Sequence, residues 1–471
     1  MVTGGRWQGW LDQSLYYTST LAFAHGDLTP ARHWYPLVYS LLAVPALPIL
    51  PHNPYLLLDA LCVGTVVECV LRVAALFDIG RRAALLLFLA TSFLYPGLQN
   101  AWLEPWTSTL SAAFIWILIA RTGQILVNAE PLRARGAAVL GAVGALIPLT
   151  RPADAVIVLV IGAWLSASLA ARRGLGIRIV GAAVLGAAFP LAVYALLYLA
   201  IYGVQATEYT RGSLQIGLSF SDIGWKATVL YLDPQPWFPE SDGMLRWMPW
   251  LLLGLAGGGV AVLRAPRAMR GYVAMLLVAM TAYVLVLTAY IDLVPSGLWR
   301  FGNIHYFKWI FPLLGLLGWQ FVRDAKRQPG TSAAVLAAIV SVTCARFDAV
   351  PASAQEPARR VDFRAPPAVV DNWSHVYFAQ SVVIDGRRVR RTYLAYRQVP
   401  DGAIVRVIAL RRDFASPVAW YGAGLPRVTG VIVTDPTAIL AGTWPAAPIA
   451  RWKARLGWGA PCWIVSCPDR R

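Results

Sequence analysis

Residues 178–202 read Arg-Ile-Val-Gly-Ala-Ala-Val-Leu-Gly-Ala-Ala-Phe-Pro-Leu-Ala-Val-Tyr-Ala-Leu-Leu-Tyr-Leu-Ala-Ile-Tyr, with a single charge, Arg178, at their start. Such a run predicts a helix that crosses a lipid bilayer, because about 20 apolar residues span its hydrocarbon core. Similar runs recur along the chain, which is 58% hydrophobic and 14% charged, with a mean hydropathy of +0.55. Soluble domains are about a quarter charged. The sequence therefore predicts a mainly α-helical, polytopic membrane protein.

The apolar runs predict about ten transmembrane helices. We expect them at 55–76, 82–99, 103–121, 135–150, 152–171, 178–202, 246–264, 271–290, 305–323 and 331–346. The segment 35–50 is also apolar, but it is short and broken by Pro36, Pro45 and Pro48. We interpret it as a re-entrant or juxtamembrane helix, so that residues 1–50 form a first outer loop followed by this helix.

Basic residues predict the orientation, because short cytoplasmic loops are rich in Arg and Lys. One set of connections holds Arg81, Arg82, Arg121, Arg133, Arg135, Arg172, Arg173, Arg178, Arg264, Arg267, Arg270, Arg323, Lys326 and Arg327. The alternate set holds only Arg151, Arg211, Lys226, Arg246, Arg300 and Lys308, over longer loops. The first set is expected in the cytoplasm, so the net charge of +17 indicates membrane anchoring and not nucleic-acid binding.

The tail, 347–471, differs in composition and is expected to form a small α+β soluble domain outside the membrane, while 1–346 form the transmembrane domain. Ser381–Ile384, an Asp385-Gly386 turn and 387–396 predict a β-hairpin. Residues 404–410 and 428–434 predict further strands. Cys462 and Cys467 fit either a small disulfide loop or two free thiols.

Two carboxylates fall on the predicted outer side. Asp12 precedes a group of aromatic residues, and Glu104 stands in Leu103-Glu104-Pro105 at the outer end of a span. A carboxylate at the membrane surface is a candidate general base. The alternative is structural in both cases: an N-cap for Asp12 and helix initiation for Glu104. Glu68 and Arg72, four residues apart, are expected to pair as a structural contact.

Four basic side chains on the same outer side are candidates to bind a phosphate. Arg151 stands between two spans in Thr150-Arg151-Pro152, and Arg300, His305 and Lys308 precede a late span. Arg recognises phosphate through its fork of N–H donors. The alternatives are a snorkelling Arg151 and an interfacial belt at Lys308. The histidines and cysteines show no zinc-ligand spacing. The sequence also contains no Gly-rich loop of the nucleotide-binding type, so ATP-driven transport is unsupported.

In their order along the chain, these motifs resemble the GT-C superfamily, the polytopic glycosyltransferases that use polyprenyl-phosphate sugars, which includes protein O-mannosyltransferases and aminoarabinose transferases. The resemblance covers about residues 8–325 and rests on Asp12, Tyr35-Pro36, Leu103-Glu104-Pro105, Thr150-Arg151-Pro152 and the segment from Arg300 to Pro312. It implies sugar transfer, with inversion, from an undecaprenyl-phosphate-type donor to a glycan, lipid or protein acceptor. The implied location is the bacterial inner membrane, with the site and the tail in the periplasm.

The resemblance also implies roles for residues. Asp12 would be the catalytic base or an acid that positions the acceptor, and Glu104 the supporting second acid. Arg151 and Arg300 would hold the lipid phosphate, with His305 and Lys308 beside them. The tail would bind the acceptor. Candidates for substrate binding are Tyr16, Tyr35, Tyr39 and Trp102.

Two departures from the family pattern bear on these expectations. Gln13 stands where the family often has a second acid, which weakens a metal site in the first loop, although a divalent metal stays open as a cofactor. The family also has a transmembrane helix just before the first acid. We therefore expect the natural chain to begin upstream of Met1. Two other functions stay open: a transporter or flippase for lipid-linked glycans, and a non-catalytic scaffold that presents the tail.

Overall fold

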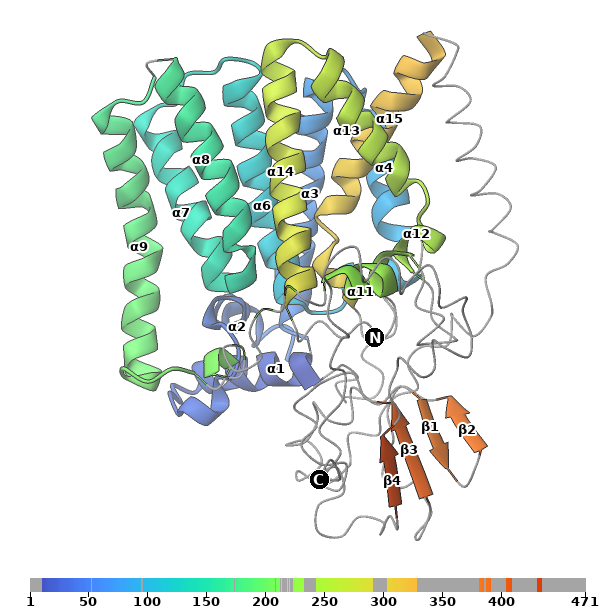
Figure 1. Ribbon diagram of the computed structural model, residues 1–471. Coiled ribbons are helices and arrows are strands. Elements are labelled where there is room, and N and C mark those ends of the chain that lie inside the picture. The colour runs from blue at the N-terminus through green and yellow to red at the C-terminus, as the bar shows by residue number, and fades with distance from the viewer. Residues whose placement is uncertain are drawn as a thin grey trace. The chain divides into compact units, whose positions relative to one another are not determined.

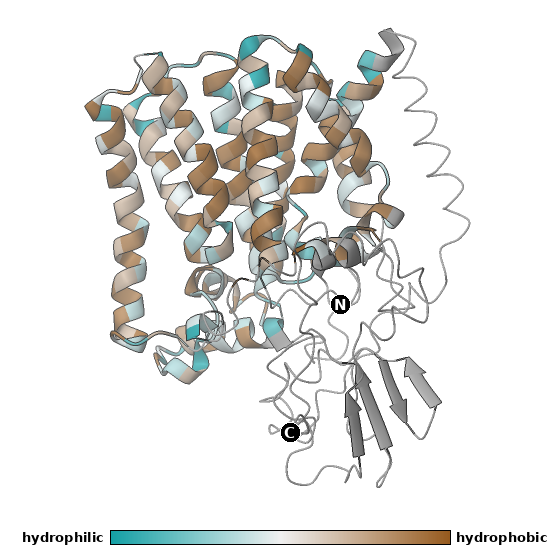
Figure 2. Cartoon of the chain, in the orientation of Figure 1, coloured by the Kyte–Doolittle hydropathy of each residue, from teal (hydrophilic) through white to brown (hydrophobic). Residues whose placement is uncertain are grey.

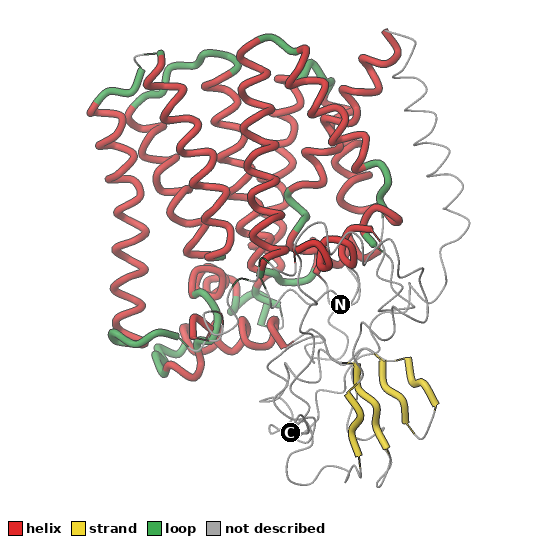
Figure 3. Tube along the Cα trace, in the orientation of Figure 1, coloured by secondary structure: helices red, strands yellow, loops and turns green. Residues whose placement is uncertain are grey.

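The structure is a computed structural model that describes residues 11–51, 53–94, 96–172, 174–207, 209–211, 213, 218, 220, 223–232, 243–290 and 303–327, and four strands of the tail. Its contacts divide the chain into two units. The first is Met1–Gly217 with Trp250–Leu287 and Ile304–Ser341, and the second is Leu218–Pro249 with Thr288–Asn303 and Val342–Arg471. The first unit is a bundle of long helices joined by connections at its two ends (Figures 1 and 3).

The first unit contains helices of very different length. In chain order they are α1 (Leu11–Ala24), η1 (Pro30–Arg32), α2 (Leu37–Ala43), η2 (Val44–Ala46), α3 (Tyr55–Leu76), α4 (Arg81–Phe93), α5 (Pro96–Leu103), α6 (Thr107–Leu126), α7 (Ala134–Thr150), η3 (Pro152–Asp154), α8 (Ala155–Ala171), α9 (Ile177–Tyr202), α13 (Leu251–Arg264), α14 (Arg267–Ala289), η5 (Asn303–Tyr306) and α15 (Ile310–Arg327).

Four helices in the described part of the chain are long and apolar enough to cross a membrane. They are Thr107–Leu126, Pro152–Ala171, Ile177–Tyr202 and Arg267–Ala289, and the bent pair α4–α5 would make a fifth. The segment Leu37–Ala46 and helices α7 and α13 are apolar but shorter. Hydrophobic residues dominate the middle of the long helices, and hydrophilic residues are more frequent near their ends (Figure 2). The protein is thus mainly helical, with several helices that could span a bilayer.

The predicted helix at 82–99 is broken, and Pro96 is the reason. Proline has no N–H to donate and disfavours helical geometry in the residue before it. Helix α4 therefore ends at Phe93, and α5 starts at Pro96 after a bend of 99°. The Gln99 side chain donates a hydrogen bond of 2.8 Å to the Phe93 carbonyl, which would otherwise be a free acceptor at the end of α4. The predicted span at 331–346 lies outside the described residues.

Burial distinguishes the centre of the bundle from its edge. Of the most apolar stretch of α6, 78% is buried, against 6% for α9. Helix α9 packs on α7 through glycines: a Cβ on Gly141 would lie 1.9 Å from the Ala183 carbonyl oxygen, and one on Gly186 would lie 1.9 Å from that of Ala138. Only glycine permits this approach, which is how helices associate where lipid removes the hydrophobic drive.

The two ends of the bundle differ in charge. The connections α3–α4, α6–α7, α8–α9 and α13–α14 share one end, which α15 also reaches (Figure 1). Arginines there bond to free carbonyls at helix ends. Arg323 donates to Phe77 and Asp78, each at 2.8 Å, and Arg172 donates to Leu126 at 3.1 Å. These bonds favour Arg at helix C-termini whatever the compartment. The α1–α2 segment and the turns before α6, α8 and α15 lie at the opposite end.

The described part of the second unit consists of short elements. Helix α11 (Ile223–Ala227) continues into a π-helix, η4 (Thr228–Leu232), and α12 spans Met244–Trp247. In the tail, β1 (Ser381–Ile384), β2 (Arg387–Arg390), β3 (Ile404–Ile408) and β4 (Gly430–Val433) form a sheet of order β2-β1-β3-β4. Ile384 pairs with Arg387 in the antiparallel β1–β2 pair. Strands β3 and β4 are parallel. A soluble α+β domain over 347–471 stays a prediction.

Candidate active site

Asp12 lies in the first turn of α1 and is half-buried. The Tyr35 hydroxyl donates a 2.7 Å hydrogen bond to its Oδ1. Burial raises the pKa of Tyr35 well above its ordinary value and the Asp12 carboxylate adds to the rise, so this phenol stays a proton donor. Because α1 begins at Leu11, Asp12 stands within the helix and not at its N-cap. Its charge still favours the helix start, and a carboxylate near the membrane surface stays a candidate general base.

Three tyrosines continue from Asp12 into the bundle. The Tyr35 ring lies 4.9 Å from that of Tyr16 and 5.3 Å from that of Tyr209, between ring centroids. Pro36 is the N-cap of α2, so Tyr35 precedes the helix. Tyr16 and Tyr35 are both predicted to bind substrate. Tyr16 is only 3% exposed, whereas Tyr35 is half-buried and can therefore contact a substrate as well as Asp12.

Tyr39 and Trp102, which were also predicted to bind substrate, are core residues. Tyr39 is fully buried, donates its hydroxyl proton to the Asp59 carboxylate at 2.9 Å from each oxygen, and stacks on Tyr55 at 4.6 Å. Trp102 is 1% exposed and packs against Phe88. Direct contact of either side chain with substrate would require these packed rings to move.

Arg151 immediately follows α7, where Pro152 stops the helix. Its side chain is 10% exposed, so it does not snorkel into water. It lies 3.7 Å from Asp154 Oδ1, and its guanidinium sits 4.6 Å above the Tyr306 ring. Asp154 also accepts a 2.5 Å hydrogen bond from Ser111. Close Arg–carboxylate pairs have N–O distances of about 2.7–2.9 Å, so the fork of Arg151 is only loosely engaged by Asp154.

His305 and Lys308 lie on the turn that leads into α15, and both are buried. His305 stacks on Trp106 at 4.0 Å, and its Nδ1 is 2.9 Å from Ser108 Oγ. The Lys308 ammonium donates to the Ala101 carbonyl at 2.7 Å and to Thr109 Oγ1 at 2.6 Å. These bonds join the end of α5 to the start of α6. The geometry supports a structural role for Lys308, and its binding of phosphate stays a prediction.

Glu104 is half-buried in the connection between α5 and α6. Its N–H donates to the Asn100 carbonyl at 2.9 Å, and α6 begins only at Thr107, so Glu104 closes α5 and does not initiate α6. Burial raises the pKa of its carboxyl group above the ordinary value, and Trp106 and the charge of Lys308 oppose the rise. A carboxyl group in such a setting can donate as well as accept a proton.

These residues converge on one end of the first unit. Tyr16 lies within electrostatic range of both Asp12 and Tyr306. Arg151 likewise interacts with Tyr306 and with Tyr209, whose ring packs on Tyr35. Lys308 interacts with Arg151, Asp59 and Glu104. Asp12, Glu104 and Arg151 thus share one region, as the charge pattern predicts. Arg300 lies outside the described residues.

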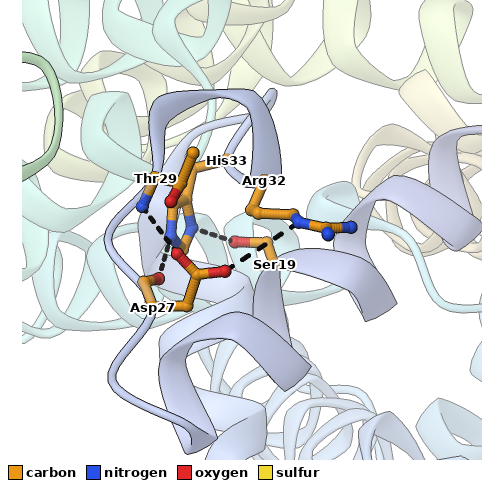
Figure 4. A network of polar contacts seen from close by, with 5 residues as sticks. All are labelled: Ser19, Asp27, Thr29, Arg32 and His33. Atoms are coloured by element: carbon orange, nitrogen blue, oxygen red, sulfur yellow. Dashed lines mark hydrogen bonds and ion pairs between the residues drawn. The ribbon is translucent and has the colours of Figure 1, made fainter.

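A second polar network fixes the loop after α1 (Figure 4). His33 Nε2 lies 2.9 Å from the Asp27 carbonyl, which only accepts, so Nε2 carries the proton and Nδ1 accepts from Ser19 at 2.8 Å. Asp27 in turn accepts from the Thr29 N–H at 2.9 Å. Tyr202, at the end of α9, donates to the His33 carbonyl. The network ties the Asp12-bearing helix to the edge of the bundle.

Several site residues escape the sequence reasoning. Asp154 and Asp59 both lie within predicted spans, and a carboxylate in an apolar span is itself the signal that could have identified them. Tyr209 and Tyr306 gave no such signal, because tyrosines are common near membrane surfaces. The predicted pairing of the exposed Glu68 and Arg72 is confirmed, with 2.9 Å between Arg72 Nε and Glu68 Oε1.

Within the described part of the chain, no group of three or more His, Cys, Asp or Glu side chains is arranged to hold a metal ion. Comparison with protein-family models, with curated proteins and with solved structures finds no match. Functional inference therefore rests on the residues and their geometry.

Proposed function

We propose that the protein is a membrane glycosyltransferase that moves a sugar from a polyprenyl-phosphate donor to an extracytoplasmic acceptor. One observation carries the proposal: at one end of a helical bundle, Tyr35 joins Asp12, to which it donates a hydrogen bond, to Tyr209, which interacts with Arg151. Arg151 lies 3.7 Å from its carboxylate partner, Asp154. The Asp12 carboxylate suits proton abstraction from a hydroxyl, and the Arg151 guanidinium suits a phosphate.

In the proposed reaction the oxygen of an acceptor hydroxyl attacks the anomeric carbon of the donor, and Asp12 takes the proton of that hydroxyl. The bond from that carbon to the phosphate oxygen breaks, and the electron pair leaves with the lipid phosphate. A single displacement inverts the anomeric centre. Arg151 stabilises the negative charge that grows on the departing phosphate, which lowers the barrier. Burial raises the pKa of Glu104. Its carboxyl group hydrogen-bonds the acceptor hydroxyl or relays the proton.

The protein would lie in the bacterial inner membrane. Ten spans would cross it, with the Arg-rich end of the bundle in the cytoplasm and the Asp12 end in the periplasm. The transmembrane catalytic domain would comprise 1–346, and 347–471 would be a periplasmic domain that binds the glycan, lipid or protein acceptor. Arg300 and His305 would assist Arg151 with the donor phosphate.

The test is Asp12→Asn, which keeps the size and the hydrogen-bond acceptor but removes the base. We expect sugar transfer to fall by about 10²–10⁴-fold in membranes supplied with a panel of polyprenyl-phosphate sugars, with unchanged insertion and thermal stability. The matched control is Glu68→Gln, which neutralises an exposed carboxylate on α3 and should leave transfer unaltered.

Full transfer by Asp12→Asn would refute the role of Asp12. Movement of intact donor across the bilayer, without cleavage of the sugar–phosphate bond, would instead favour the flippase. These two outcomes are separated by chemical analysis of the lipid product on each side of a sealed vesicle.

A further inference from the structure

Gln13 is a buried amide, 1% exposed. Neither its Oε1 nor its Nε2 has a hydrogen-bond partner within the described part of the chain. A carboxamide carries two N–H donors and a carbonyl acceptor, and buried polar groups in native proteins are nearly always bonded. An amide left without partners destabilises the folded protein, so its presence requires an explanation.

The position of Gln13 links it to the proposed active site. It directly follows Asp12 in α1 and stands three residues before Tyr16, so Gln13 and Tyr16 share a helix face. That face is turned into the protein: Tyr16 packs edge-on against Tyr39 at 5.6 Å, and Thr20, one turn further, donates to the Ser40 carbonyl at 3.1 Å. The amide therefore points inward, on the face it shares with Tyr16, one residue along the helix from Asp12.

We propose that Gln13 binds hydroxyl groups of the transferred sugar. Because Gln13 is 1% exposed, the side chains packed around it must move to admit the sugar. This inference rests on the proposed function and names the part of the donor that Gln13 recognises. Each sugar hydroxyl both donates and accepts a hydrogen bond, and a carboxamide offers both complementary atoms at one point. The amide is also uncharged, so it adds no repulsion toward Asp12 or the donor phosphate, as a second carboxylate would.

Stability and binding of Gln13→Met test the proposal, because Met has similar size and carries no hydrogen-bonding group that needs a partner. In the absence of lipid, this variant is expected to melt at a higher temperature than the unaltered protein. The matched control is Gln124→Met. Gln124 accepts a 2.5 Å hydrogen bond from Arg121 near the other end of the bundle, so its loss should not raise the melting temperature.

Two lipid probes separate the sugar from the phosphate: sugar-free polyprenyl phosphate, and the same lipid that carries mannose, glucose, arabinose or N-acetylglucosamine. For the glycosylated lipid that binds best, Gln13→Met should bind about tenfold more weakly than the unaltered protein, a loss typical of one hydrogen bond. Binding of sugar-free lipid should be the same in both proteins.

The inference is overturned if Gln13→Met melts lower than the unaltered protein and binds glycosylated lipid equally well, which would indicate an amide satisfied by ordered water only. It is also overturned if the loss is equal for both lipids. Absence of binding of either lipid by the unaltered protein would instead refute the proposed donor class, so the two failures are distinguishable.

Discussion

Replacing Arg151 by Met should destabilise the folded protein, because Asp154 would be left as an isolated buried charge. The two groups lie 3.7 Å apart, and the Asp154 side chain is 1% exposed. At that distance and an effective dielectric constant near 20, two unit charges attract by about 4–5 kcal/mol. Loss of one partner of a buried pair costs about 3–5 kcal/mol in mutational data. We therefore expect a loss of roughly this size in the free energy of unfolding.

The double variant Arg151→Met with Asp154→Leu separates stability from function. It removes both charges, and replacement of a buried pair by apolar side chains is often neutral or stabilising. Ser111 loses its acceptor, but a helical serine can donate to the carbonyl four residues before it. The double variant should therefore unfold within about 1 kcal/mol of the unaltered protein, yet bind sugar-free polyprenyl phosphate much more weakly.

Both quantities are measurable on protein in detergent: unfolding by tryptophan fluorescence at a fixed heating rate, and lipid binding by native mass spectrometry. Equal stability of the single variant and the unaltered protein would show that the pair is not energetically coupled. A double variant as unstable as the single one would point to the same failure. Undiminished phosphate binding by the double variant would refute Arg151 as the phosphate ligand.

Two further predictions concern structure outside the site. Burial lowers the pKa of His33 below its ordinary 6.5, so the folded protein favours the neutral ring while the unfolded chain takes up a proton. Stability of the loop after α1 should therefore fall as pH drops below about 6.5, seen as smaller amide protection factors there, and His33→Gln should flatten this dependence. Gly141→Leu should cost more than about 3 kcal/mol because its Cβ would meet backbone, whereas Gly181→Leu, with open space at its Cβ, should cost little; equal costs would contradict the α7–α9 packing.

Hydrophobic runs predicted most helices of the first unit because a long apolar run has few alternatives to a helix. The helix over 55–76 coincides with α3, and 178–202 differs from α9 by one residue at its start. The same reasoning failed at 82–99, because average hydropathy is insensitive to a single Pro96, whereas the backbone is not. Hydropathy also overstates membrane crossing: α7, with 17 residues, and α13, with 14, are apolar but shorter than a helix that spans a bilayer.

Charge topology predicted which functional candidates share an end of the bundle, but not their partners. Alternation of basic connections assigns Asp12, Glu104 and Arg151 to one end without any knowledge of packing. That Tyr35 donates to Asp12 depends on how the α1–α2 segment folds back, over 23 residues of chain. Sequence spacing contains no information on such a return. Arg151 and Asp154 are three residues apart, a spacing that predicts a contact within a continuous helix. Pro152 interrupts the helix between them, so the spacing alone does not predict their pairing.

Lys308 and Arg151 show why a basic residue near an apolar span is ambiguous from sequence. In both cases a charge near an apolar span is energetically costly, and both residues fall on the predicted outer side of the membrane. Their partners separate them: the Lys308 ammonium makes two bonds of 2.7 Å or less to Ala101 and Thr109, whereas Arg151 reaches its carboxylate only at 3.7 Å. A phosphate must compete for donors, and it competes best where existing bonds are long. The length of the contacts already made therefore ranks Arg151 ahead of Lys308 as the phosphate ligand, an order that residue type and position alone cannot supply.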